Sequence, residues 1–226
     1  MSTAKSDLRL KLRLEQRFLS RLRGLFAAEV RDYRVGLGRG FVPDVQARFG
    51  ESLEQILLSH YRSVSDVFAH MISKQLSADV KPTDEELAIL DAKIEEVMTT
   101  RAVQQAAAIH RTTQKRMDSA PADAGRRLLD ANGSPPTKAE RDALAVSLLT
   151  TNLLGRVRTI ACYETQWSSE SSKVLEVTVL LDAEGGVEVK SQEELTVAKK
   201  RWQSQGDSRV RTLSDGSAFD HLAADG

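Results

Sequence analysis

Cysteine is almost missing from this chain of 226 residues, in which Cys162 is the only one. A single cysteine excludes an internal disulfide framework and a zinc site built from cysteines. It is typical of a protein from a reducing compartment. Aromatic residues are also scarce, at 5% of the sequence, whereas long stretches are rich in Leu, Ala, Glu and Arg. This composition favours a mainly α protein over a β-sandwich.

Long apolar runs are missing as well. No uninterrupted apolar run reaches about 18 residues, and the N-terminus carries charges every few residues where a signal peptide would have an apolar core. We therefore expect neither secretion by that route nor a membrane span. The chain has 32 basic and 32 acidic residues, so no global field favours nucleic acid. Residues 1–40, however, hold ten Lys and Arg against four Asp and Glu, which predicts a basic N-terminal arm.

Apolar residues recur at spacings of three, four and seven along four stretches, which is the period of an amphipathic helix. The first stretch ends in "GLGRG", residues 36–40, followed by Pro43. A phosphate-binding glycine loop follows a strand, and this one follows a helix, so we interpret Gly36, Gly38 and Gly40 as a turn to the next helix. The sequence predicts helices over residues 6–34, 52–76, 83–117 and 137–166.

Each of the three later helices begins with a capping box, in which a hydroxyl and a Glu or Gln three residues on bond each other's free amides. Between the third and fourth helices, Pro121, Gly125 and "NGSPP" at 132–136 predict a loop-rich connector with one short helical piece. The expected capping pairs are Ser52 with Gln55, Thr83 with Glu86, and Thr137 with Glu140.

The pattern changes at residues 174–190, "VLEVTVLLDAEGGVEVK". Two alternating runs rich in β-branched residues flank Glu-Gly-Gly, which favours a β-hairpin; the alternative is a helix that continues from Glu164. We thus expect an elongated helical N-terminal part and a small α+β C-terminal lobe that contains the hairpin. The expected domains are a basic amphipathic helix arm at 1–40, a helical region at 41–136 and the lobe at 137–226.

No arrangement of residues indicates catalysis. His60 and His70 lie ten residues apart on one expected helix, whereas helical ligand pairs lie three or four apart. We expect these two and His110 to be partly buried or surface residues of helices. Asp215, Asp220, His221 and Asp225 gather at the C-terminus, but such a composition is usual for solvated coil. We therefore expect no catalytic residue, no metal, no cofactor and no enzymatic activity.

The basic helix at 6–34 has two open interpretations. Its cations could contact DNA phosphates without reading sequence. They could equally form the solvated face of a helix that packs in an oligomer or against a partner. The candidate DNA-contacting residues are Arg9, Lys11, Arg13, Arg17, Arg21 and Arg23.

Two stretches together carry a family resemblance. "RVRTIACYETQ", 156–166, resembles the Arg-x-x-x-Ile-Ala-Arg-Thr-Glu-Thr signature of the phage Mu F-like minor head proteins, or head morphogenesis proteins, of tailed bacteriophages. "KKRWQSQGDSRVR", 199–211, is similar to that family's Lys-x-Trp-x-x-x-x-Asp-x-Arg-Val-Arg element. The resemblance covers roughly residues 140–226. The matching residues are Arg156, Ile160, Ala161, Glu164 and Thr165 in the first stretch, and Lys200, Trp202, Asp207, Arg209, Val210 and Arg211 in the second.

The resemblance implies a structural minor head protein, made in the cytoplasm of a bacterial host and carried in the virion at the portal or neck. Such a protein assists head assembly or DNA delivery, with the portal or other head and neck proteins as partners, and forms a homo-oligomer or several copies on a ring. The alternative is a DNA-binding or DNA-organising protein that acts through the basic helix. For a minor head protein, the residues with structural or partner-binding roles would be Arg156, Glu164, Trp202, Asp207, Arg209 and Arg211. Trp202 would be the anchor of the C-terminal lobe, and its Asp and Arg neighbours would clamp that lobe together.

Overall fold

A computed structural model describes residues 3–69 and 82–183 of the chain. The chain divides into two units, Met1–Leu180 and Leu181–Gly226, and the helices described below belong to the first apart from the last residues of the fourth. No strand occurs in the described ranges, so the prediction of a mainly α protein is confirmed. The elements are α1 (Thr3–Gly38), α2 (Ala47–Phe68), α3 (Asp84–Asn132) and α4 (Lys138–Ala183).

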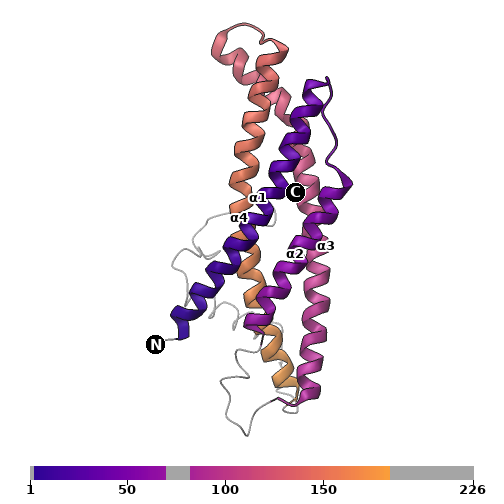
Figure 1. Cartoon of the computed structure of the whole chain (residues 1–226), viewed down its shortest axis with the longest axis vertical. Coiled ribbons are helices and arrows are strands. Elements are labelled where there is room, and N and C mark those ends of the chain that lie inside the picture. Colours follow the sequence, from indigo (N-terminus) through magenta and orange to yellow (C-terminus); the bar gives the residue numbers. More distant parts are fainter. Residues whose placement is uncertain (1–2, 70–81, 184–226) are drawn as a thin grey trace, which may run out of the picture. The chain divides into compact units, whose positions relative to one another are not determined.

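Contacts between helices show that each helix runs antiparallel to the next. Arg21 of α1 bonds Ser59, and Asp32, further along α1, pairs with Arg48 at the start of α2. Residue numbers therefore rise in one helix as they fall in the other. The same reversal relates α2 to α3 and α3 to α4, which makes an up-down-up-down bundle (Figure 1). The further contacts are Arg62–Glu95 for α2 and α3, with Val45, two residues before α2, bonding Gln114 of α3, and Arg101–Glu164 and Arg156–Thr112 for α3 and α4.

All four helices contribute to one cluster of buried apolar side chains. Each fully buried large side chain stabilises the fold by about 1.5–3 kcal/mol relative to an exposed one. On α4 the cluster follows the helical period, because Leu149, Leu153 and Val157 succeed one another at intervals of four. Its largest fully buried members are Phe18, Leu22, Phe26 and Tyr33 on α1, Phe49, Leu53, Leu57 and Tyr61 on α2, Leu90, Met98 and Met117 on α3, and Leu149 on α4.

The turn between α1 and α2 depends on two glycines. A Cβ added at Gly36 would lie 2.6 Å from Cδ of Pro43, so no larger residue fits there without a shift. Gly40 has a φ of 91°, in the left-handed region that side chains disfavour. The prediction of a turn to the next helix is confirmed, but α1 runs on through Gly36 to Gly38, so of the three predicted glycines only Gly40 lies in the turn itself.

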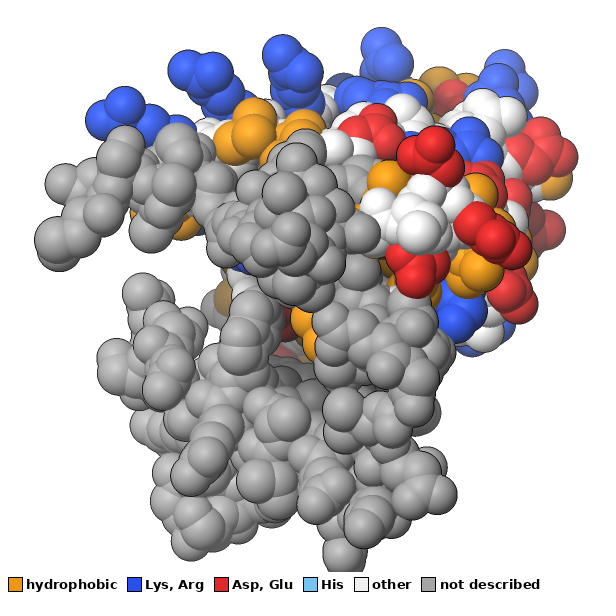
Figure 2. Space-filling view, turned by 90° about the horizontal axis from the view of Figure 1, so that it is seen from below, with side chains coloured by type: hydrophobic (Ala, Val, Ile, Leu, Met, Phe, Trp, Pro, Cys, Tyr) orange, Lys and Arg blue, Asp and Glu red, His pale blue; other side chains and the backbone are white. Residues whose placement is uncertain are grey.

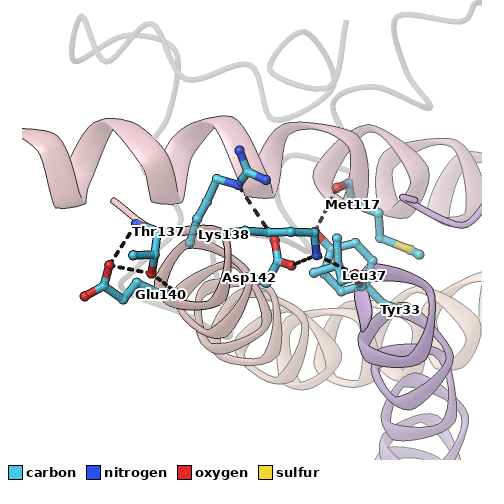
Figure 3. A network of polar contacts seen from close by, with 8 residues as sticks. Tyr33, Leu37, Met117, Thr137, Lys138, Glu140 and Asp142 are labelled. Carbon is cyan, nitrogen blue, oxygen red and sulfur yellow. Dashed lines mark hydrogen bonds and ion pairs between the residues drawn. The ribbon is translucent and has the colours of Figure 1, made fainter. Parts of the chain in front are cut away.

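Two of the three predicted capping boxes are present. Thr83 donates its backbone N–H to Glu86 Oε2 at 2.6 Å, and Glu86 donates its own to Thr83 Oγ1 at 3.3 Å. Thr137 and Glu140 bond each other in the same way, at 2.8 and 3.3 Å (Figure 3). The third prediction is wrong, because α2 begins at Ala47 and Ser52 lies inside it. The helix starts early because Phe49 is already buried in the core.

The predicted connector between the third and fourth helices is largely wrong, because α3 continues through Pro121 to Asn132. Proline lacks the N–H that would bond the carbonyl four residues earlier. That carbonyl belongs to Met117, and it accepts the hydroxyl of Tyr33 at 3.3 Å (Figure 3). A contact from α1 therefore supplies the donor that proline removes. Gly133, with a φ of 66°, then ends α3.

The first turn of α4 is attached to the last turn of α1. Lys138 Nζ donates to the carbonyl of Leu37 at 3.0 Å and also pairs with Asp142 one turn further along α4 (Figure 3). A cation at the C-terminal end of a helix satisfies a free carbonyl and the helix dipole together. The bond fixes where α4 starts against α1.

The predicted α+β lobe with its hairpin is wrong, because α4 runs on to Ala183 and includes the first expected strand. Ser172, Glu176 and Val179 are buried, at intervals of four and three. A strand would place Val177 on the same face as Val179, yet Val177 is 39% exposed. Packing in the bundle outweighs the strand preference of β-branched residues, which depends strongly on context. The rest of the expected hairpin, 184–190, lies outside the described residues.

No described helix is both long and apolar enough to span a membrane. The expectation of no membrane-spanning helix is confirmed for the described part of the chain.

Candidate functional site

A row of polar side chains is buried where α4 faces α2 and α3. On α4 these are a carboxylate and three hydroxyls that are at most 3% exposed. Isolated polar groups in such a place destabilise a protein unless they find partners, so their contacts define what the row does. We call it the polar seam; it comprises His60, Tyr61 and Ser65 of α2, Arg101 of α3, and Glu164, Thr165, Ser168 and Ser172 of α4.

The carboxylate of Glu164 joins three helices. Tyr61 donates its hydroxyl to Oε2 at 2.6 Å. Arg101 donates to both carboxylate oxygens, from Nη2 to Oε1 at 3.1 Å and from Nε to Oε2 at 3.3 Å. The Arg101 side chain is 18% exposed and that of Glu164 is 4% exposed. This is therefore a largely buried ion pair with bidentate geometry.

The environment of this pair keeps Arg101 charged and Tyr61 neutral. Burial, followed by the negative charge of Glu164, raises the pKa of the Tyr61 hydroxyl. Burial disfavours the charge of Arg101, but Glu164 outweighs it, and the pKa of the guanidinium is raised. The guanidinium carbon also lies 4.7 Å from the ring centre of Trp167 and 5.9 Å from that of Tyr163. Two rings and a carboxylate of α4 thus hold one cation of α3.

His60 is bonded to α4 in one tautomer. Thr165 donates its hydroxyl to the carbonyl of Ala161 at 2.7 Å, so the hydroxyl oxygen can only accept from His60, whose Nε2 lies 2.9 Å away. Nε2 therefore carries the proton. The ring stacks on Phe18 with centroids 4.0 Å apart, and burial, with Arg21 next, lowers the pKa of His60 to about 3. His60 is a neutral packing residue of a helix, and at 5% exposure it is more deeply buried than the partly buried or surface position expected for it.

The serines extend the polar seam along α4. Ser172 donates to the carbonyl of Ser168 at 2.8 Å. Ser65 must then be the donor in the 3.0 Å contact between the Ser65 and Ser172 hydroxyls. Ser168 Oγ lies 3.5 Å from the carbonyl of Tyr61. Ser168 and Ser172 of α4 thus contact Tyr61 and Ser65 of α2, one turn apart on each helix, so the polar seam sets the register of α4 on α2.

The first motif therefore has an architectural place in the bundle. Arg156 is half-buried on α4, and its Nη2 donates to the hydroxyl of Thr112 on α3. Glu164, two turns further along α4, contacts Arg101 on the same neighbouring helix. The structure brings these two predicted residues to one helix interface. The other predicted residues of this set, Trp202, Asp207, Arg209 and Arg211, lie outside the described residues.

Most of the polar seam was not among the predicted residues. Tyr61 falls in the apolar stripe of its helix, and Arg101 gives no local signal of a partner in α4. Ser168 and Ser172 did leave a trace, since they occupy core positions at helical spacing where an apolar side chain would be usual. A helix that keeps small hydroxyls at such positions indicates a close polar contact with a neighbour.

The candidate DNA-contacting residues separate into two groups in the structure. Lys11 and Arg21 already have partners, because Lys11 donates to Gln166 and Arg21 donates to Ser59 at 2.9 Å. Burial also lowers the pKa of Lys11. The remaining four project from the exposed side of α1 and make no ion pair with any described residue: Arg9, Arg13, Arg17 and Arg23.

A surface depression of about 650 Å³ is lined by side chains of α3 alone, from His110 to Ser119, and so has the form of an open groove on one helix. Among the described residues no group of three or more His, Cys, Asp and Glu side chains could hold a metal ion. The C-terminal group of Asp215, Asp220, His221 and Asp225 lies outside them.

The chain was compared with protein-family models, with curated proteins and with solved structures, and none of the three comparisons found a match.

Proposed function

We propose that this chain is a structural assembly protein of the minor-head-protein type, carried at the portal or neck of a tailed phage head. The observation that carries the proposal is the place of Arg156, Glu164 and Thr165, the polar matches of the first motif. Each bonds a side chain of another helix. Their chemistry is used in packing, as expected for a protein whose role is to present a rigid surface to its neighbours.

The architecture supports the same proposal. α3 and α4 have 49 and 46 residues, so each is roughly 70 Å long at 1.5 Å per residue. Long antiparallel helices with one shared core supply extended faces for contact with portal or neck proteins, or with further copies on a ring. Several large apolar side chains remain exposed on these two helices: Ile89, Val103, Leu129, Leu154, Tyr163, Val174 and Val177.

The test is made in the virus that encodes the chain. A tagged copy should sediment with purified heads and should cross-link to the portal or to a neck protein. A Glu164→Ala, Arg101→Ala double variant, which removes the central ion pair of the polar seam, should lose this incorporation. Glu95→Gln, which alters an exposed ion pair with Arg62, is the matched control and should be incorporated normally.

Two outcomes would overturn the proposal. Deletion of the gene with no change in the number or infectivity of particles would exclude a role in head assembly or DNA delivery. A tagged, folded chain that stays in the host lysate while heads assemble would exclude the virion location.

A further inference from the structure

In the part of α1 whose side chains are described, the outer side carries cations and no exposed anion. Between Leu8 and Gly38, every exposed charged residue of α1 is an arginine; Glu15 and Asp32 are half-buried and Glu29 is buried. Figure 2 shows Lys and Arg side chains projecting in a row along one edge of its view. We call the exposed arginines without an ion-pair partner among the described residues the arginine stripe; it comprises Arg9, Arg13, Arg17, Arg23, Arg31 and Arg34.

We propose that the arginine stripe binds the phosphate backbone of duplex DNA without reading its sequence. This inference does not rest on the proposed assembly role. The stripe differs from the set expected from the sequence, because Lys11 and Arg21 are occupied by partners on α4 and α2 and because Arg31 and Arg34 extend it toward the end of α1. Arginine suits this task, since its planar guanidinium bonds phosphate oxygens in pairs.

The dimensions of the stripe fit a duplex. From Arg9 to Arg34 the helix rises about 38 Å at 1.5 Å per residue, close to the length of one turn of B-DNA, about 34–36 Å. Its cations therefore face a row of phosphates over a full turn. Between them lie small or uncharged exposed residues, Gln16, Ser20, Gly24 and Ala27, and a Cβ at Gly24 would meet nothing within 4 Å. The backbone of α1 can approach the DNA closely.

The same residues favour DNA over an anionic membrane. A helix that lies in a membrane surface buries an apolar face among the lipids. The apolar face of α1 is occupied by the bundle core, in which Phe18, Leu22 and Phe26 are at most 1% exposed. In the described part of α1, the exposed large apolar side chains lie near its two ends, Leu8, Leu10 and Leu12 at the start and Val35 near the last turn, so they form no continuous apolar face.

The test measures binding of the full chain to a fluorescent 30-base-pair duplex of mixed sequence, and to a second duplex of unrelated sequence, over a series of salt concentrations. Each phosphate neutralised contributes about −0.9 to the slope of log K against log salt. The stripe variant is Arg13→Gln, Arg17→Gln, Arg23→Gln and Arg31→Gln. Its matched control loses the same charge from exposed arginines of α3 and α4, through Arg111→Gln, Arg116→Gln, Arg127→Gln and Arg158→Gln.

We expect the unaltered chain to bind both duplexes alike, the stripe variant to bind more than tenfold more weakly at low salt, and its slope to be smaller by about 3 to 4. The control should keep most of the affinity and of the slope. Circular dichroism checks that both variants stay helical.

Three results would overturn the proposal. The first is no binding by the unaltered chain at low salt, and the second is an equal loss in the control, which would reduce the effect to net charge. The third uses vesicles of phosphatidylglycerol and phosphatidylcholine. If the unaltered chain binds these vesicles and the stripe variant does not, while both bind DNA equally well, the stripe is a lipid-binding surface.

Discussion

The hydroxyl of Tyr61 lies 2.6 Å from Oε2 of Glu164, a carboxylate that is 3% exposed and 103 residues away in the chain. The same carboxylate holds Arg101 in two bonds. One side chain of α4 therefore fixes both α2 and α3. Because a buried charge is tolerated only with its partners in place, this contact ties the order of the three helices to a single geometry.

Removing the Glu164 carboxylate should be among the most damaging single changes in the bundle. Glu164→Ala leaves the Arg101 guanidinium and the Tyr61 hydroxyl without their shared acceptor, and the loss of one partner from a buried ion pair costs about 3–5 kcal/mol. Glu164→Gln keeps an acceptor oxygen and should cost less. Denaturant unfolding followed by circular dichroism gives the free energies of unfolding.

Glu95→Gln is the control for this prediction. It alters an ion pair of the same chemistry, but Arg62 and Glu95 are 55% and 49% exposed, so solvent screens their attraction. The free energy of unfolding should barely change. Equal effects at Glu95 and Glu164 would contradict the view that burial makes the Glu164 contacts important.

His60 should make the bundle less stable in mild acid. Its pKa is lowered to about 3 in the folded chain, chiefly by burial, whereas an unfolded histidine has a pKa of about 6.5. Between these values the unfolded chain binds a proton that the folded chain does not. The free energy of unfolding is therefore unaffected by the titration of His60 above about pH 6.5. As the pH falls from there toward 3, the titration of His60 lowers the free energy of unfolding by up to about 1.4 kcal/mol per pH unit.

The measurement compares the free energy of unfolding of the unaltered chain with that of His60→Gln between pH 7 and pH 5. Carboxylates also titrate in acid, but they are the same in both proteins and cancel in the comparison. The glutamine can still donate to Thr165 but does not titrate, so the free energy of unfolding should fall less steeply with acid in the variant. His110→Gln, a change at a half-buried histidine of α3, is the control. Parallel pH profiles for the chain and His60→Gln would refute the prediction.

Sequence predicted the parts of this fold that depend on neighbours in the chain. The boxes at Thr83 and Thr137 are local bonds between residues three apart, and both are present. The box at Ser52 has the same residue types, yet burial of Phe49 starts α2 earlier. Residues 174–183 have strand-like composition, yet the burial of Glu176 and Val179 on one side of α4 makes them helical. In both cases tertiary packing outweighs a valid local signal.

In the polar seam, too, local signals could be predicted from the sequence and long-range contacts could not. The motif at 156–166 pointed to Arg156 and Glu164 only through its resemblance to the signature of the minor head proteins. It could not supply Tyr61 or Arg101, which are distant in sequence and meet Glu164 only when three helices assemble. A pair of this kind leaves no local spacing to detect.

Gly36 and Gly155 should respond in opposite ways to alanine. A Cβ at Gly36 would lie 2.6 Å from Pro43 Cδ and 3.2 Å from the carbonyl oxygen of Phe41, so Gly36→Ala should destabilise the chain by about 1–3 kcal/mol. Gly155 is exposed within α4, with nothing within 4 Å of its Cβ position. There alanine should stabilise by about 0.5–1 kcal/mol through its better helix propensity. The midpoints of thermal unfolding of the two variants, compared with that of the unaltered chain, test both expectations. If Gly36→Ala were stabilised, the α1–α2 turn would not be tight.

Pro121 and Tyr33 should be energetically coupled through the backbone carbonyl of Met117. With proline at 121, the Met117 carbonyl has no helical donor four residues on, and it accepts the buried Tyr33 hydroxyl. Burial also raises the pKa of that hydroxyl to about 12, so Tyr33 remains a donor at neutral pH. Tyr33→Phe should then cost about 1–3 kcal/mol, the usual loss when a buried group is left unbonded.

The same change should cost less in a Pro121→Ala chain, because alanine restores an N–H to the Met117 carbonyl. A double-mutant cycle on the free energy of unfolding, built from Tyr33→Phe, Pro121→Ala and their combination, measures this coupling, which we expect at about 0.5–1.5 kcal/mol. Additive effects would show that Tyr33 stabilises the bundle by packing alone. Coupling would show instead that α3 tolerates a proline in its interior because α1 provides the missing donor.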